Sequence, residues 1–234
     1  RVFNSFVEND GSKKVGKKAF LESFNNLIES VDKNGFMEET IIPVCSNNTI
    51  VDGAHRLATA IYYNKSISCV NINNTSHNFD YSFFKQQGLD VVFLDVMASE
   101  YVRLKNNVYM LLLWPAANGN DVEFLDILNT YGSIVHQKDI YLTKEGGVKL
   151  VRQVYKNESW VGSKRDSFIG ARNKASWCFA NSKKALKVFL FESTKDLIKM
   201  KEEIRGLFNI EKHAVHINDT KEETLELTGY QKLK

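Results

Sequence analysis

The stretch from Ile50 to Ala60, with the sequence IVDGAHRLATA, constrains the fold more than any other part of the chain. Two β-branched residues come first, as is typical of a buried strand. The pair Asp52-Gly53 then interrupts the strand, because glycine readily adopts the positive φ angles of tight turns. Small and apolar residues at helical spacing follow. We therefore expect a strand, a turn and a helix in immediate succession.

The composition of this turn is typical of an anion-binding site. The first amides of a helix have no partner within the helix, and the helix dipole favours negative charge at that end. Arg56 adds a planar donor fork that suits phosphate oxygens, and His55 adds a further donor. A plain turn with a solvated arginine is the structural alternative. The candidate nucleotide-phosphate site is Asp52, Gly53, Ala54, His55 and Arg56, with Asp52 also the candidate Mg²⁺ ligand.

The pattern around this turn predicts a first domain over residues 1–76. An amphipathic helix is expected before Asn34-Gly35, a pair that suits the end of a helix. Short apolar runs bounded by polar turns then predict strands. The polar stretch 73–76 marks the boundary of the domain. The expected elements are helix 19–31, strands 41–45, 49–51 and 67–72, and helix 54–63.

The rest of the chain predicts a helical connector over 77–106 and a second, mixed α/β domain over 107–234. Strand and helix patterns alternate in this second part, which indicates elements that pack around a core of their own. The predicted fold class is therefore α+β. The expected elements are strands 108–114, 134–142, 187–191 and 214–217, helices 122–131, 148–155, 194–208 and one from 220 onward, and a long loop over 157–174.

Composition limits the functional classes. A formal net charge of +3 does not indicate a nucleic-acid partner, which we regard as unlikely from sequence. No apolar run approaches the ~20 residues that span a bilayer, and no signal-peptide pattern is visible, so no membrane partner is expected. Three cysteines without metal-type spacing are typical of free thiols in a reducing compartment. We therefore expect a cytoplasmic protein.

The segment from Phe20 to Val70 resembles the ParB/sulfiredoxin superfamily. A helix, a glycine, the IPV strand at 42–44, the IVDGAHRLATA segment and a further strand follow in the order of that fold. The resemblance covers the N-terminal third of the chain. It implies a ParB/sulfiredoxin-like domain that holds nucleotide phosphates on the turn at Gly53, closest in motif to the free-serine-kinase type of member.

The resemblance also suggests which activity of the superfamily fits. Free-serine kinases use a D-G-x-x-R turn for phosphate and an upstream glutamate as base, and Glu8 occupies the corresponding place. Those kinases usually have a histidine where this chain has Val7. Sulfiredoxin needs a cysteine where this chain has Ala54, and no helix-turn-helix segment of the ParB type is recognisable. The resemblance therefore implies Glu8 and Asp52 as the catalytic residues.

Two later segments carry further candidates. The loop 157–174 is long, polar and basic, and the aromatic side chain of Trp160 can stack on a base or a sugar. In the second segment, His213 and His216 are expected on opposite faces of a strand, so they are not expected to share a metal. A solvated loop and a helix capping box are the structural alternatives. The candidates for an acceptor site or second site are Trp160, Lys164, Arg165, Lys174, His216 and Asp219.

These features together predict an ATP- or ADP-dependent, Mg²⁺-assisted kinase that phosphorylates the hydroxyl of a small molecule such as an amino acid or a polyol. Its partners would be the nucleotide and this small substrate. One alternative is a non-catalytic, ParB-like nucleotide-binding switch that acts on DNA or on a protein partner. Another is that the C-terminal domain is the enzyme and the first domain only binds phosphate. The sequence leaves open whether the chain forms a homodimer.

Overall fold

The computed structural model describes residues 14–37, 39–72, 79–181 and 183–229. The chain divides into two compact units, Arg1–Val91 and Val92–Lys234, and its fold class is α+β, as predicted. Among the described residues, no helix is both long enough and apolar enough to cross a bilayer.

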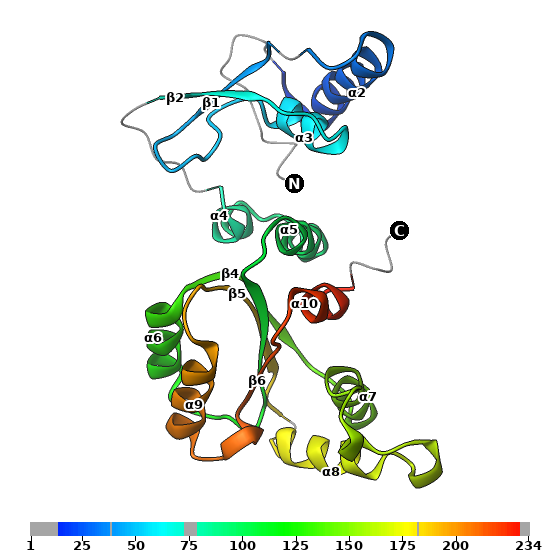
Figure 1. The fold of residues 1–234 in the computed structure, drawn as a ribbon, viewed down its shortest axis with the longest axis vertical. Helices are drawn as coiled ribbons and strands as arrows, with labels where there is room; N and C mark the ends of the chain where they lie inside the picture. The colour runs from blue at the N-terminus through cyan, green and yellow to red at the C-terminus, as the bar shows by residue number, and fades with distance from the viewer. Residues whose placement is uncertain (1–13, 38, 73–78, 182, 230–234) are drawn as a thin grey trace. The chain divides into compact units, whose positions relative to one another are not determined.

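The first unit contains a pair of parallel strands joined through a helix (Figure 1). Parallel strands require a crossover connection, which the helix after the Asp52-Gly53 turn provides. The predicted strand at 49–51 is reduced to a single bridge between Ile50 and Val44. The elements are α2 (Gly16–Asn34), β1 (Ile41–Val44), α3 (Ala54–Tyr62), β2 (Ser68–Asn71) and α4 (Tyr81–Gln86).

The core of the first unit is small. Ile42 and Val44 alternate inward from β1, while Phe20 comes from α2 and Ala60 from α3. All four side chains are buried. β1, α2 and α3 therefore each contribute buried apolar side chains to this unit.

The second unit is built on a four-stranded antiparallel sheet with the order β4-β5-β3-β6. Helix α6 connects β3 to β4, and helix α9 connects β5 to β6. In the sheet, the strands of one strand–helix–strand half alternate with those of the other. This is the βαββαβ topology of ferredoxin-like folds. The elements of the two halves are β3 (Val108–Leu113), α6 (Asp121–Tyr131), β4 (Ser133–Ile140), β5 (Leu186–Glu192), α9 (Leu197–Phe208) and β6 (Val215–Ile217).

Helices cover both faces of this sheet (Figure 1). On the central strand β3, Leu111 and Leu113 face the core beneath α6 and α9, while Met110 and Leu112 face the opposite core. This alternation follows from the two-residue period of a strand. A strand buried on both faces is apolar throughout, which is why the sequence predicted β3 so clearly. The helices on the second face are α5 (Val91–Leu104), α7 (Lys144–Val154), α8 (Ile169–Cys178) and α10 (Lys221–Leu227).

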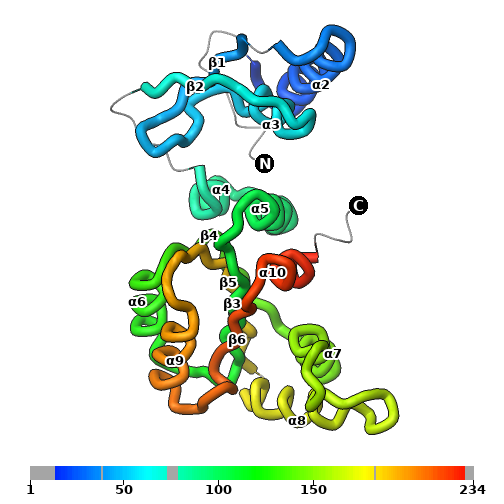
Figure 2. Tube along the Cα trace, in the orientation of Figure 1, coloured from blue at the N-terminus to red at the C-terminus, as the bar shows by residue number. Residues whose placement is uncertain are grey.

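Two predicted segments look different in the structure. The segment 77–106 contains helix α4 and helix α5, and α5 contributes Ala98 and Val102 to the core of the second unit. The predicted loop 157–174 contains two short 3-10 helices, and its last part belongs to α8. In the sequence, α7 and α8 come between β4 and β5. Figure 2 shows both helices on the face of the sheet opposite α6 and α9. The 3-10 helices are η1 (Ser159–Val161) and η2 (Lys164–Asp166).

A buried amide joins the last strand to the central strand. The Asn218 side chain is 1% exposed, and its Oδ1 accepts a hydrogen bond from the Met110 backbone N–H at 2.5 Å. Its Nδ2 donates to the Thr220 carbonyl and to Thr224 Oγ1, both at 2.5 Å. Thr220 caps α10 by accepting from the Glu223 backbone N–H at 3.2 Å. Asn218 and Thr220 therefore have structural roles in this turn.

The packing around Gly132 predicts a large effect on stability. A Cβ at Gly132 would lie 2.1 Å from the Glu192 carbonyl oxygen, which belongs to the neighbouring strand β5. Gly206, in the exposed interior of α9, has nothing within 4 Å. We expect Gly132→Ala to lower the free energy of unfolding by roughly 3 kcal/mol and Gly206→Ala to raise it by ~0.5–1 kcal/mol.

The measurement is urea unfolding followed by tryptophan fluorescence. The chain has three tryptophans, and all of them lie in the second unit, so this signal reports that unit. Equal stabilities of the two variants would contradict the close approach between Gly132 and β5.

Candidate functional site

The turn between Asp52 and α3 places a left-handed glycine at the start of a helix that has no side-chain cap among the described residues. Gly53 is buried with φ of 90°, in the left-handed region that favours glycine. The Gly53 N–H donates to Asp52 Oδ1 at 2.5 Å, and the Gly53 carbonyl accepts the first helical hydrogen bond from Leu57 at 2.9 Å. No side chain of the described residues caps α3. The positive end of the helix dipole is therefore not covered by a capping group.

Arg56 is held beside this turn by weak contacts. Its Nη2 lies 3.4 Å from Asp52 Oδ2, and its Nη1 donates to the Ile41 carbonyl at 3.4 Å. A Cβ at Gly53 would lie 3.1 Å from Arg56 Nη2, so the guanidinium lies close to the glycine. The Arg56 and Asp52 side chains are 38% and 50% exposed. An ion pair this exposed contributes little stability, so an incoming phosphate can replace it at small cost.

The other predicted residues of the first unit differ in their placement. The His55 ring stacks on Phe24, with 4.8 Å between centroids, and meets Phe20 edge-on. Its contacts are therefore those of a packing residue between α3 and α2. Ala54 is exposed at the start of α3. Glu8 lies outside the described residues.

The turn offers Mg²⁺ too few ligands to bind it alone, but it suits an Mg²⁺ ion that is already coordinated by phosphates. Among the described residues, no group of three His, Cys, Asp or Glu side chains is arranged to hold a metal ion. Mg²⁺ commonly takes one or two carboxylates together with phosphate oxygens and waters. Asp52 offers a single, half-exposed carboxylate, which fits this second mode of binding.

A larger open pocket of about 610 Å³ lies within the second unit. It is lined by residues from the end of α7, from η1, α8, α9 and β6, from the start of α10, and from the 3-10 helix η3 (Glu211–His213). Four of the predicted second-site residues line it together: Trp160, Lys174, His216 and Asp219. Lys164 and Arg165 do not line it; they are exposed in η2, whose start is fixed by a capping box between Ser163 and Asp166.

Lys174 is the most buried cation of this pocket. The residue is 7% exposed, and its amine donates to the Lys212 carbonyl at 2.6 Å and lies 3.3 Å from His213 Nδ1. Burial lowers the pKa of Lys174. Burial also raises the pKa of the neighbouring Cys178 thiol to about 11, so the thiol stays neutral and does not balance the lysine charge.

The two histidines of the pocket are not arranged as the sequence predicted. His213 lies in η3, before the strand begins, and both His213 and His216 line the same pocket. The prediction that they point to opposite faces of one strand was wrong, because His213 is not part of the strand. Burial lowers the pKa of both, in His216 to about 4. Both rings are therefore neutral at pH 7.

The pocket also contains residues that the sequence did not single out. The Tyr155 ring meets His216 edge-on and Trp160 at a tilt, with centroid distances of 5.0 Å and 5.1 Å. The Trp177 ring stacks on His213, with 5.7 Å between centroids. No sequence motif marks these residues, because they come from segments far apart in the chain. The other charged residues that line the pocket and were not among the predicted site residues are Glu158, Lys201, Arg205, Lys212 and Glu223.

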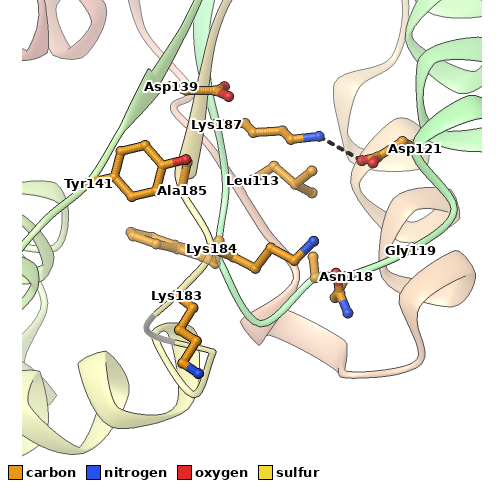
Figure 3. Close-up of a pocket in the computed structure, with 12 residues that line it drawn as sticks. Leu113, Asn118, Gly119, Asp121, Asp139, Tyr141, Lys183, Lys184, Ala185 and Lys187 are labelled. Atoms are coloured by element: carbon orange, nitrogen blue, oxygen red, sulfur yellow. Dashed lines mark hydrogen bonds and ion pairs between the residues drawn. The ribbon is translucent and has the colours of Figure 1, made fainter.

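A second, smaller pocket of about 220 Å³ lies where the loop after β3 meets the end of β4 and the start of β5 (Figure 3). Lys187 crosses it and donates to Asp121 Oδ1 at 2.7 Å. Asp139 lines the same pocket together with Lys183 and Lys184. The pocket contains both acidic and basic side chains, and some of them pair with each other. It therefore has fewer charged groups free to bind a ligand than the larger pocket.

Comparison with protein-family models finds none that matches this chain, and comparison with curated proteins finds no significant match. The candidate sites are therefore assigned from their own residues.

The buried His216 predicts a pH dependence of stability. Its pKa of about 4 lies below the ordinary value of 6.5, so the unfolded chain takes up the proton first as pH falls. The stabilisation by neutral His216 is complete above pH 6.5 and is lost as pH falls toward 4. At pH 5 we expect this residue to cost about 2 kcal/mol relative to pH 7.

The matched variant is His216→Gln, which does not titrate. Urea unfolding at pH 7 and pH 5 should show a smaller loss for the variant than for the wild type. Parallel losses in the two proteins would contradict a neutral, buried His216.

Proposed function

We propose that this chain is a nucleotide-dependent phosphotransferase that binds the phosphates of ATP or ADP at the turn from Asp52 to Arg56. The observation that carries the proposal is the left-handed Gly53 at the uncapped start of α3, with the Arg56 guanidinium beside it. The resemblance of the segment 20–70 to the ParB/sulfiredoxin superfamily supports the same assignment.

Each part of the turn has a role in this proposal. The α3 amides would donate to phosphate oxygens along the helix axis. Arg56 would leave its weak contact with Asp52 and bind a phosphate through two parallel hydrogen bonds. The freed Asp52 carboxylate would then help to hold Mg²⁺, which neutralises phosphate charge when it is bound with the nucleotide.

The proposed reaction transfers the terminal phosphoryl group to a small hydroxyl compound. The acceptor oxygen attacks the terminal phosphorus, the bond to the bridging oxygen breaks, and the shortened nucleotide leaves with the bridging oxygen. The acceptor proton passes to a general base. By resemblance to free-serine kinases this base is Glu8.

Calorimetric titration of ATP, ADP and CTP, each with Mg²⁺, tests the phosphate site. We expect Arg56→Ala to weaken nucleotide binding by ~1.5–3 kcal/mol, the contribution of a charged hydrogen bond. The control is Arg172→Ala, which removes the same charge from an exposed position on α8, in the other unit. It should bind like the wild type.

The outcomes of this titration differ in what they exclude. If the wild type binds none of the three nucleotides, the phosphotransferase proposal is wrong. If it binds them but transfers no phosphoryl group to any amino acid or polyol in an acceptor screen, the protein is instead a non-catalytic nucleotide-binding switch. Salt-sensitive DNA binding would then be the next measurement.

Glu8→Gln tests the base. Because glutamine cannot accept the proton, we expect turnover of the accepted substrate to fall by at least ~100-fold while nucleotide affinity stays within a few fold. The conservative variant Glu8→Asp should retain part of the activity. Wild-type turnover in Glu8→Gln would remove this residue from the mechanism.

A further inference from the structure

Four cations line the pocket of the second unit: Lys174, Lys201, Arg205 and Lys212. Lys174, Arg205 and Lys212 form no ion pair with any residue in the part of the chain that the structure describes. The fourth cation, Lys201, pairs with Asp219 at 2.8 Å. The pocket therefore keeps a local excess of positive charge, although two further carboxylates also line it.

One of these cations has a buried donor without an acceptor. The Nε–H of Arg205 is inaccessible to solvent and makes no hydrogen bond to any described residue. Leaving a buried donor of a charged group unpaired costs free energy, and a shift of Arg205 that exposes Nε to a ligand oxygen would recover it. Lys174 is in a related position, because the partners of its buried amine are a carbonyl, a neutral ring and the neutral Cys178 thiol, none of which carries a negative charge. Both observations favour an anion.

The aromatic side chains that line the pocket indicate which chemical group is attached to this anion. Trp177 is 64% exposed and Trp160 is 42% exposed, although both are large side chains that are usually well buried. Trp177 is held by stacking on His213, and Trp160 by its contact with Tyr155. An exposed indole held in place beside a cationic pocket offers a flat surface for a ring. The pocket volume of about 610 Å³ is within the usual range for small-molecule sites.

We propose that the pocket between α7, α8, α9 and β6 is a binding site for a small organic phosphate that carries a ring. Its phosphate binds Arg205, Lys174 and Lys212, and its ring stacks on Trp177 or Trp160. A nucleoside phosphate and a sugar phosphate share this chemistry. The proposal uses no residue of the first unit, so it does not depend on the proposed phosphotransferase function.

Tryptophan fluorescence tests the proposal directly on the full chain. All three tryptophans lie in the second unit, and Trp114 is 0% exposed, so a change in the solvent-accessible signal comes from Trp160 and Trp177. The probes are AMP, glucose 6-phosphate, adenosine and inorganic phosphate. We expect a saturable change with AMP or glucose 6-phosphate and a Kd below ~1 mM, and binding at least ~10-fold weaker for adenosine and for inorganic phosphate.

The comparison between the two ring-bearing phosphates identifies the source of the ring. A response to AMP alone assigns a nucleobase, and a response to glucose 6-phosphate alone assigns a sugar. A saturable response to inorganic phosphate that the ring does not improve would overturn the assigned ligand class. No saturable response to any of the four probes would overturn the proposal as a whole.

Two variants separate the charge from the ring. Arg205→Met keeps the length of the side chain and removes its donors, and should raise the Kd by at least ~10-fold. Trp177→Ala, at an exposed position, should weaken the ring-bearing probes but not inorganic phosphate, as read by calorimetry. The control is Arg172→Met, which removes an arginine from α8 at a position outside the pocket. It should leave the Kd unchanged.

Arg56→Ala distinguishes this site from the turn of the first unit. The fluorescence response should be the same in Arg56→Ala as in the wild type, even where that variant loses the part of the calorimetric nucleotide binding that is assigned to the first unit. Loss of the fluorescence response in Arg56→Ala, together with a normal response in Arg205→Met, would assign the signal to the first unit and overturn the proposal.

Discussion

The hydrogen bonds of the buried Asn218 amide fix β6 and α10 against the central strand β3. Through the Met110 backbone N–H, the amide connects the chain after β6 to the central strand, and through Thr224 it connects the same point to α10. A buried amide with its donors and acceptor paired fixes one geometry, because any shift would leave a polar group unpaired. His216 and Asp219 lie on either side of Asn218 in the sequence, so the same bonds place two residues of the larger pocket.

The two candidate sites bind anions in different ways. In the first unit the donors would be the α3 amides and one half-exposed arginine, which already makes a weak contact that a ligand can replace. In the second unit they are side chains on several elements, and Lys174 is buried with no carboxylate partner among the described residues. A backbone turn of this kind recognises phosphate in general, whereas side chains from many elements can also recognise what the phosphate is attached to.

The strands and most helices could be predicted because apolar patterning decided them, whereas α8 and the larger pocket could not. β3 and β5 are apolar on both faces and were found nearly to the residue. The first part of helix α8 was assigned to a loop because its buried positions, Ala171, Lys174, Ala175 and Cys178, combine small residues with a lysine and give only a weak apolar stripe. Lys174 and Trp160 were singled out for loop chemistry, but Arg205 lies in an ordinary amphipathic helix that gives no sign of its unpaired donor.

Gly170 shows how a locally unfavourable residue serves the pocket. Glycine lowers helix propensity, and nothing in the sequence explains one in the first turn of α8. In the fold, a Cβ at Gly170 would lie 1.7 Å from the Trp160 carbonyl oxygen, so only glycine lets α8 pack against η1. This contact brings Trp160, on η1, to the same pocket as Lys174 and Trp177, on α8. The cost in helix propensity is thus linked to a packing contact that helps to place the aromatic residues beside the cations of the pocket.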